Sequence, residues 1–245
     1  MLFLFAVPTA WCQTADPKVE NASAVVLQWG FVYMPPLASL GEDGQAQGTL
    51  ADIMAGTSLH SGIAYEPQEF PNARAIYSLN AHKVNFAIGV KSLVKNPNMF
   101  VFSAFPVATM QLIIVWRQGT ERVSSVDDLE GKRLVLLTGY TYAGLRTKFE
   151  KIAKSAIEVE THDRAIGALK LKRGNYALLY ETASTYSIAL GKQLDFETQV
   201  VSEVDLYFTL NKTVPDTEQL MQRLEAGFLS YQTLQKISTD ETIIE

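Results

Sequence analysis

The sequence predicts an α/β protein built in two lobes, with two strands crossing between the lobes. Strand-like and helix-like segments alternate along most of the chain, which is typical of parallel sheets covered by helices. Two long extended segments, 100–119 and 200–212, each fall between two such α/β blocks. The 245 residues are 47% hydrophobic and 19% charged, which is ordinary globular composition with enough length for one large domain or two smaller ones.

The first half of the chain contains three predicted strands and two predicted helices before the first long extended segment. The β-rich run AVVLQWGFV occupies 24–32, and 49–62 carries apolar residues at helical spacing. A strand over 63–70, a helix over 73–83 and a buried strand over 84–90 follow. This order predicts one αβ-layered unit.

The second half repeats this style but not the sequence. Short apolar runs again alternate with segments of helical periodicity. The predicted strands are 133–139, 157–162 and 175–181, and the predicted helices are 141–154, 164–172, a segment near 182–190, and 216–236.

The two extended segments define the predicted domain boundaries. If both cross between the lobes, lobe one consists of 23–104 together with 205–245, and lobe two consists of 105–204. A cleft between two lobes that only two strands connect is a hinge architecture.

The N-terminus, residues 1–22, resembles a secretory signal. Its apolar run MLFLFAV is too short to span a bilayer, and a proline and small residues follow it. The alternative is an apolar first strand, since the basic start of a signal is missing. Export favours a periplasmic location, and a mature chain that has lost Cys12, the single cysteine, contains no disulfide and no thiol nucleophile.

Charge and hydropathy exclude two classes of partner or location. The formal net charge is −5, and the densest basic cluster, KLKRG at 170–174, is short, so we expect no nucleic-acid binding. The longest later apolar run, QLIIVW at 111–116, has the length of a strand, not of a membrane span. The mature chain is expected to be a soluble monomer.

Five segments in sequence resemble the type II periplasmic solute-binding proteins of family 3, which contains the extracellular amino-acid-binding proteins of ABC transporters. The segments are YMPPLASLGEDGQAQGTLADIM (33–54), NAHKVNFAIG (80–89), FVFSAFPVATMQLIIV (100–115), SVDDLEGKRLVLLTGYTY (125–142) and RGNYALLYE (173–181). The resemblance covers nearly the whole mature chain. It implies the two-lobed type II fold with two hinge-crossing strands, and an exported protein that captures a small polar solute for a membrane transporter permease.

The loop after the strand 133–137 is the strongest local site prediction. Thr138, Gly139 and Thr141 lie where a strand ends, a glycine turns the chain and a helix is expected to begin. Free backbone N–H groups and a helix dipole there would favour a carboxylate or another anion. The alternative for Thr141 is a plain helix cap. The resemblance also places Tyr33 on the cleft wall, where a half-buried tyrosine at a strand end is the alternative.

At the end of the segment 175–181, the resemblance assigns Glu181 the ligand's ammonium group, although a solvated glutamate in a first helical turn explains the residue equally well. Tyr180 beside it is expected either to close over a ligand or to belong to the core. Both interpretations stay open for both residues.

The chain departs from the family where the α-carboxylate of the ligand would bind. Segment 89–103 contains no arginine, and its nearest cations are Lys91 and Lys95, which bind anions without the two-pronged geometry of arginine. Asn85 also stands where the family has an aspartate. Arg74 is a further possible ligand group, with an exposed helix face as the alternative. A standard α-amino acid ligand is therefore in doubt.

The sequence does not demand an enzyme. The three histidines, His60, His82 and His162, lie on different elements without metal-ligand spacing, and there is no GxSxG, P-loop or GxGxxG motif. We therefore expect no catalysis, no metal and no cofactor. Two alternatives are a periplasmic lyase or dehydratase on the same fold, with Glu181 as general acid or base, and a sensor or protein-contact module.

Overall fold

The computed structural model describes residues 25–182 and 196–242, and the side chains of its last helix up to residue 237. The signal-like segment 1–22 and nearly all of the helix predicted near 182–190 lie outside the described residues. Both remain predictions.

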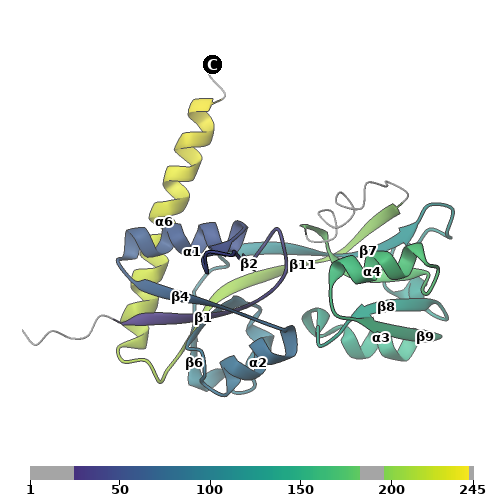
Figure 1. Cartoon of the computed structure of the whole chain (residues 1–245), viewed down its shortest axis with the longest axis horizontal. Helices are drawn as coiled ribbons and strands as arrows, with labels where there is room; N and C mark the ends of the chain where they lie inside the picture. The colour runs from purple at the N-terminus through teal and green to yellow at the C-terminus, as the bar shows by residue number, and fades with distance from the viewer. Residues whose placement is uncertain (1–24, 183–195, 243–245) are drawn as a thin grey trace, which may run out of the picture.

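The first half of the structure is a mainly parallel sheet with helices packed on it (Figure 1). Strand β1 pairs in parallel with β4 and β5, as expected for the alternating pattern of this region. The small hairpin of β2 and β3 leads into helix α1. The elements are β1 (Val26–Val32), β2 (Ser39–Leu40), β3 (Ala46–Gln47), α1 (Thr49–Ser61), β4 (Ala64–Phe70), α2 (Asn72–Asn80), β5 (Phe86–Gly89) and β6 (Phe100–Phe102).

The second half extends the same sheet with strands in the order β7, β10, β8 and β9. Strands β10, β8 and β9 are mutually parallel, while β7 runs antiparallel to β10. Residues of β8 and β10 are buried almost throughout, which explains their unbroken apolar character. The elements are β7 (Ala108–Arg117), β8 (Arg133–Leu137), α3 (Arg146–Ile152), β9 (Ser155–Val159), α4 (His162–Lys170) and β10 (Tyr176–Tyr180).

Strand β11 (Phe196–Asn211) belongs to both halves. Its residues from Phe196 to Leu206 pair with β7, and the residues from Tyr207 onward pair with β5 and β6. Figure 1 shows β7 and β11 running side by side between the two groups of elements. The predicted segment 200–212 thus lies largely within β11, and the predicted segment 100–119 contains two strands, β6 and β7, of which β7 connects the halves together with β11.

Helix α6 (Thr217–Thr242) returns the chain to the first half and packs on α1. The contact is close, because a Cβ at Gly227 would lie 2.8 Å from the Cβ of Ser61 and a Cβ at Gly56 would overlap the Tyr231 ring. The helix continues beyond the predicted end at 236 and projects past α1 in Figure 1.

The predicted helix over 141–154 is wrong in its start. A 3₁₀ turn spans Tyr142–Gly144, and α3 begins only at Arg146. Left-handed backbone at Tyr142, Ala143 and Gly144 prevents a continuous helix here.

In the described ranges we find no helix long and apolar enough to cross a bilayer.

Candidate functional site

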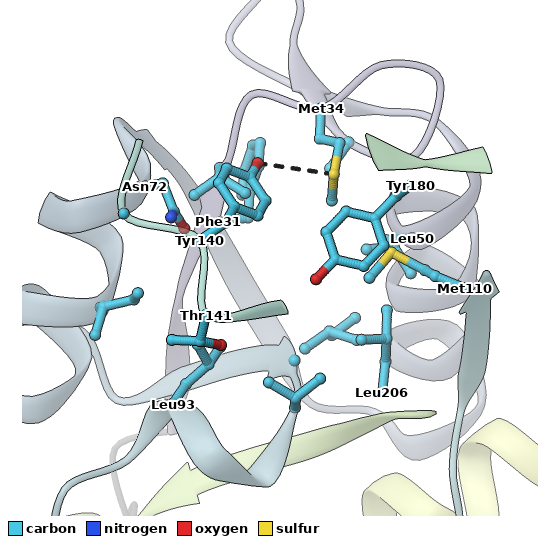
Figure 2. Close-up of a pocket in the computed structure, with 17 residues that line it drawn as sticks. Phe31, Met34, Leu50, Asn72, Leu93, Met110, Tyr140, Thr141, Tyr180 and Leu206 are labelled. Carbon is cyan, nitrogen blue, oxygen red and sulfur yellow. Dashed lines mark hydrogen bonds between the residues drawn. The ribbon is translucent and has the colours of Figure 1, made fainter. Parts of the chain in front are cut away.

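The structure contains a cavity of about 100 Å³ between the two halves of the sheet (Figure 2). The first half contributes residues from β1, α1, α2 and β5, and the second contributes the loop after β8 and the end of β10. Most of the lining side chains are apolar. They include Phe31, Met34, Leu50, Leu93, Met110 and Leu206.

A larger groove of about 510 Å³ adjoins this cavity. The two share Val32, Asn72 and Tyr140 as lining residues. Two acidic residues also line the groove, Glu69 from the end of β4 and Glu160 from the position directly after β9. The inner cavity therefore has a route outward along a more polar surface.

Cavity and groove lie at the carboxyl ends of the parallel strands. Residues 33–34 follow β1, 71–72 follow β4, 138–141 follow β8 and 160–161 follow β9. Tyr180, the last residue of β10, completes the set. Ligands of α/β proteins bind in this position because loops from several strands converge there.

An aromatic cluster forms the wall of the cavity on the second half. The rings of Tyr140 and Tyr180 lie 5.9 Å apart, and the ring of His162 stands perpendicular to Tyr140 at 6.2 Å. Tyr142 stacks on Tyr180 at 6.4 Å and also contacts Tyr140 at 6.3 Å. In Figure 2 the Tyr180 hydroxyl points into the cavity.

The side chains of this cluster are uncharged at neutral pH, and burial moves their pKa values further from neutrality. Burial raises the pKa of Tyr180 to about 12 and also raises the pKa of Tyr140. Burial lowers the pKa of His162 to about 4, against a small opposing effect of the adjacent Asp163. The His162 Nε2 is 3.5 Å from the backbone N–H of Tyr180, so the neutral ring is placed as an acceptor.

Two contacts cross from one half of the structure to the other at the cavity. The Tyr140 hydroxyl donates to the Met34 sulfur at 3.8 Å, a weak bond because a thioether is a poor acceptor (Figure 2). Gly139, with φ of +75°, packs against the start of α2. A Cβ at position 139 would lie 3.2 Å from Asn72 Nδ2 and 3.7 Å from the Ala73 Cβ, so this close approach favours glycine.

The amide of Asn72 is the unsatisfied polar group of this seam. Its Nδ2 is fully buried and has no hydrogen-bond partner in the part of the chain that the structure describes. A buried amide donor without an acceptor costs about 1–3 kcal/mol. The seam around Gly139 is therefore only weakly stabilised by its own polar contacts.

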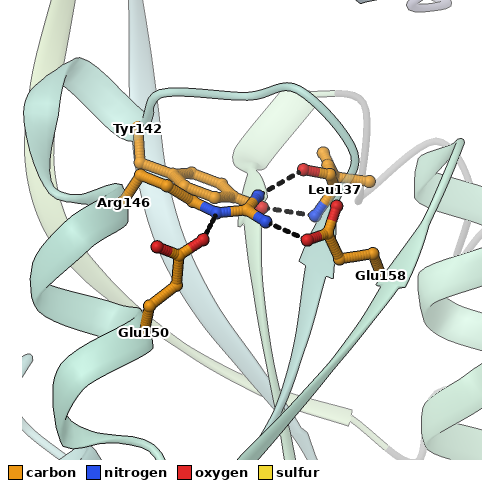
Figure 3. Close-up of polar contacts among 5 residues, drawn as sticks. All are labelled: Leu137, Tyr142, Arg146, Glu150 and Glu158. Carbon is orange, nitrogen blue, oxygen red and sulfur yellow. Dashed lines mark hydrogen bonds and ion pairs between the residues drawn. The ribbon is translucent and has the colours of Figure 1, made fainter.

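Arg146 binds the end of β8, directly before the loop that carries Gly139 and Tyr140 (Figure 3). The Arg146 guanidinium donates to the Leu137 carbonyl at 2.8 Å and pairs with Glu150 at 2.6 Å and Glu158 at 2.5 Å. The buried Tyr142 hydroxyl accepts the Leu137 N–H at 2.5 Å. Both backbone groups at the end of β8 are thus bound by side chains of the loop and of α3.

These bonds explain an unusual backbone. Tyr142 and Ala143 have φ values of +52° and +55°, which cost non-glycine residues about 1–2 kcal/mol each. The Tyr142 hydroxyl bond and the Arg146 contacts offset that cost. Local strain is therefore found where the loop places Tyr140 and Thr141 at the cavity.

Replacing Arg146 by methionine should lower the free energy of unfolding by about 2 kcal/mol, because three charge-assisted hydrogen bonds are lost. The matched control is Arg164→Met, which breaks an exposed pair with Glu160 and should cost less than about 1 kcal/mol. Urea unfolding of both variants measures the difference. Equal losses would mean that the Arg146 contacts do not stabilise the β8 end.

The nine predicted site residues fall into three groups. Gly139, Thr141 and Tyr180 line the inner cavity, and Tyr33 and Thr138 line the groove. The remaining four line neither of them. They are Arg74, Lys91, Lys95 and Glu181.

The three cations predicted for ligand binding have other positions. The Lys91 ammonium lies 3.9 Å from the Tyr207 ring centroid, in a cation–π contact. Arg74 stands over the Phe70 ring at 6.0 Å, and the exposed Lys95 has its backbone N–H bonded to Asn80. Glu181 is exposed immediately after β10. The cavity wall is thus built without these four side chains.

The helix expected to begin near Thr141 does not begin there. The seven-residue helix α3 starts five residues later, at Arg146. The loop instead presents the Thr141 side chain and the Tyr140 ring. The geometry offers neutral hydrogen-bonding groups and apolar surface.

Sequence reasoning missed the apolar lining. Met34, Met110 and Leu206 come from three distant segments, and nothing in their local pattern distinguishes them from core residues. Asn72 could have been predicted as a lining residue, because it follows the end of a strand and a proline, where ligand-binding loops begin.

Within the described ranges, no group of three or more His, Cys, Asp or Glu side chains could hold a metal ion.

No protein-family model and no curated protein sequence matches this chain. Solved structures do match. The GluR0 ligand-binding core in complex with L-glutamate has a TM-score of 0.68 at 18% identity, covering 85% of this chain and 94% of that chain. The substrate-binding protein of an amino acid ABC transporter has a TM-score of 0.67 at 16% identity, covering 88% and 96%. A histidine kinase sensor domain with similarity to periplasmic binding proteins has a TM-score of 0.73 at 14% identity, covering 90% and 95%.

The chain therefore has the two-lobed α/β fold of type II periplasmic binding proteins, of the kind seen in amino-acid-binding proteins. The fold predicted from the sequence is confirmed. At these identities the likeness concerns the fold alone, so any function has to be inferred from the cavity.

Proposed function

We propose that this protein is an exported solute-binding protein that captures a small ligand between its lobes by hinge closure. The observation that carries the proposal is the cavity, whose walls come from both halves of a sheet that β7 and β11 join. A ligand that contacts both walls stabilises the closed arrangement more than the open one, and so shifts the population.

In this proposal lobe one consists of 23–104 and 205–245, and lobe two of 105–204. The hinge then lies in the two connecting strands. Hinge closure is a common means of enclosing ligands in two-lobed proteins. The unsatisfied Asn72 amide and the weak Tyr140–Met34 bond support a closed state that needs a ligand for stability.

The recipient of the ligand is proposed to be an ABC-type transporter, with a sensor as the second possibility. The matching structures support both, because one is the substrate-binding protein of an ABC transporter and another is a histidine kinase sensor domain. A periplasmic location and a monomeric state go with this role. Capturing and delivering a ligand in this way involves no chemical reaction.

A thermal-shift screen tests the binding function. The panel contains amino acids, polyamines, dicarboxylates, uncharged aromatic compounds and short peptides at millimolar concentration. A ligand bound only to the folded state at one hundred times its Kd adds about 2.7 kcal/mol of stability, which raises the Tm by several degrees. X-ray scattering with the active compound should show a smaller radius of gyration. If no class raises the Tm, the binding function is wrong.

A further inference from the structure

The inner cavity contains no charged side chain. Among its lining residues that the structure describes, none is Asp, Glu, Lys, Arg or His. Its polar side chains are Asn72, Tyr140, Thr141 and Tyr180, and both tyrosines are neutral at pH 7. A binding site of this composition suits a ligand whose buried part carries no formal charge.

A zwitterionic amino acid would be poorly matched to this cavity. Its carboxylate and ammonium groups would lose their hydration without gaining an ionic partner, which is strongly unfavourable. The cations expected to supply that partner, Arg74 and Lys91, lie over the Phe70 and Tyr207 rings and do not line the cavity.

The size of the cavity sets the size of the buried group. Its volume of about 100 Å³ approaches that of a dry apolar cavity of about 150 Å³ that accepts benzene. The Phe31 and Tyr140 rings and the Met110 thioether provide surfaces that suit an aromatic ring.

The polar groups of the cavity favour a ligand that carries a hydrogen-bond acceptor. The Tyr180 hydroxyl points into the cavity, and the buried Asn72 Nδ2 at its edge has no acceptor among the described residues (Figure 2). A ligand oxygen that reached Asn72 would remove the unfavourable free energy of that orphaned donor.

We infer that the ligand buries an uncharged aromatic ring carrying a hydrogen-bond acceptor, such as a carbonyl or hydroxyl oxygen, and is not an α-amino acid. This inference rests on the proposed binding function and specifies its ligand class. Polar extensions of the ligand would lie in the adjoining groove beside Glu69 and Glu160.

Pairs of compounds with the same shape and different charge test the ligand class. Isothermal titration calorimetry at pH 7.5 compares benzamide with benzoate, benzyl alcohol with benzylamine, and both pairs with L-phenylalanine, L-glutamate and L-arginine. We expect each uncharged compound to bind at least about tenfold more tightly than its charged partner, a difference of about 1.4 kcal/mol.

Matched substitutions locate the binding in the cavity. Leu93→Trp fills the cavity and should abolish binding of benzamide, while Leu171→Trp, at an exposed position after α4, should leave it unchanged. If Leu93→Trp does not fold, as judged by circular dichroism, Ile76→Phe fills the same space from α2.

The outcomes separate the ligand class from the binding function. Equal or tighter binding of a charged partner or an amino acid overturns the uncharged class and leaves the binding function standing. Failure of the uncharged compounds, while another class raises the Tm in the screen, has the same meaning. Failure of every compound in both experiments overturns both proposals.

Discussion

Replacing Gly139 by valine is expected to weaken ligand binding by at least about tenfold, or 1.4 kcal/mol. Gly139 is where the loop after β8 meets the start of α2, and a Cβ there would lie 3.2 Å from the Asn72 amide nitrogen. Branched methyl groups would hold the two sides of the seam apart. Calorimetric titration of the compound that raises the Tm measures the effect.

The control for this substitution is Gly119→Val. Gly119 has almost the same φ, +79° against +75°, but a Cβ there would meet no atom within 4 Å. Both variants should lose about 1–2 kcal/mol of folding stability because a side chain is strained in this conformation. Only Gly139→Val should lose affinity. Unchanged affinity in that variant would show that the ligand-bound state does not bring this seam together.

The fold was predictable because its signals are local and repeated. The segments LVLL and YALLY lack charged residues, and they form the buried parts of strands β8 and β10. The two extended segments interrupted the alternation of strands and helices, which predicted that they connect two α/β units. They contain β7 and β11, the strands that join the halves. Errors occurred at boundaries, as at α3, where left-handed backbone overrode helix periodicity.

The site was predictable only at strand ends. Tyr33, Thr138, Gly139, Thr141 and Tyr180 all border the cavity or the groove, because carboxyl ends of parallel strands converge in space. The four charged residues predicted for the site do not border the cavity or the groove. Arg74 and Lys91 lie over aromatic rings, and Lys95 and Glu181 are exposed. The position of a long charged side chain in the sequence does not reveal which of these surroundings it adopts.

The apolar lining could not be predicted from the sequence. A methionine or leucine facing a cavity follows the same pattern as one in the core, and whether space remains beside it depends on packing between distant segments. Met34, Met110 and Leu206 belong to three such segments. The proposed ligand class therefore rests on the three-dimensional arrangement alone.

The polar contacts at the seam indicate how closure can depend on a ligand. The Asn72 donor is buried without a partner, and the Tyr140 hydroxyl has a sulfur as its acceptor. Both groups would make stronger bonds to water in an open cleft. In the proposed hinge closure, the closed state without ligand would then be unfavourable by about 1–3 kcal/mol for each such group, which is a range that modest ligand contacts can reverse.

Folding stability is expected to fall by up to about 3 kcal/mol between pH 6.5 and pH 4 because of His162. Burial lowers the pKa of this histidine to about 4 in the folded protein, whereas the unfolded chain takes up the proton near pH 6.5. In this window the unfolded state binds more protons, so stability decreases as the pH falls. Above pH 6.5 both states are neutral at this position, and this contribution vanishes.

Urea unfolding of wild type and His162→Gln at several pH values from 7.5 to 4.5 isolates the effect, because the carboxylates titrate in both proteins. Glutamine stays neutral and keeps a side-chain oxygen that can accept the Tyr180 N–H, so the variant should lose much less stability on acidification. His60→Gln, on the exposed surface of α1, should retain the wild-type dependence. If His162→Gln also follows the wild-type curve, the histidine is protonated in the folded state, and the aromatic wall of the cavity carries a positive charge in acid.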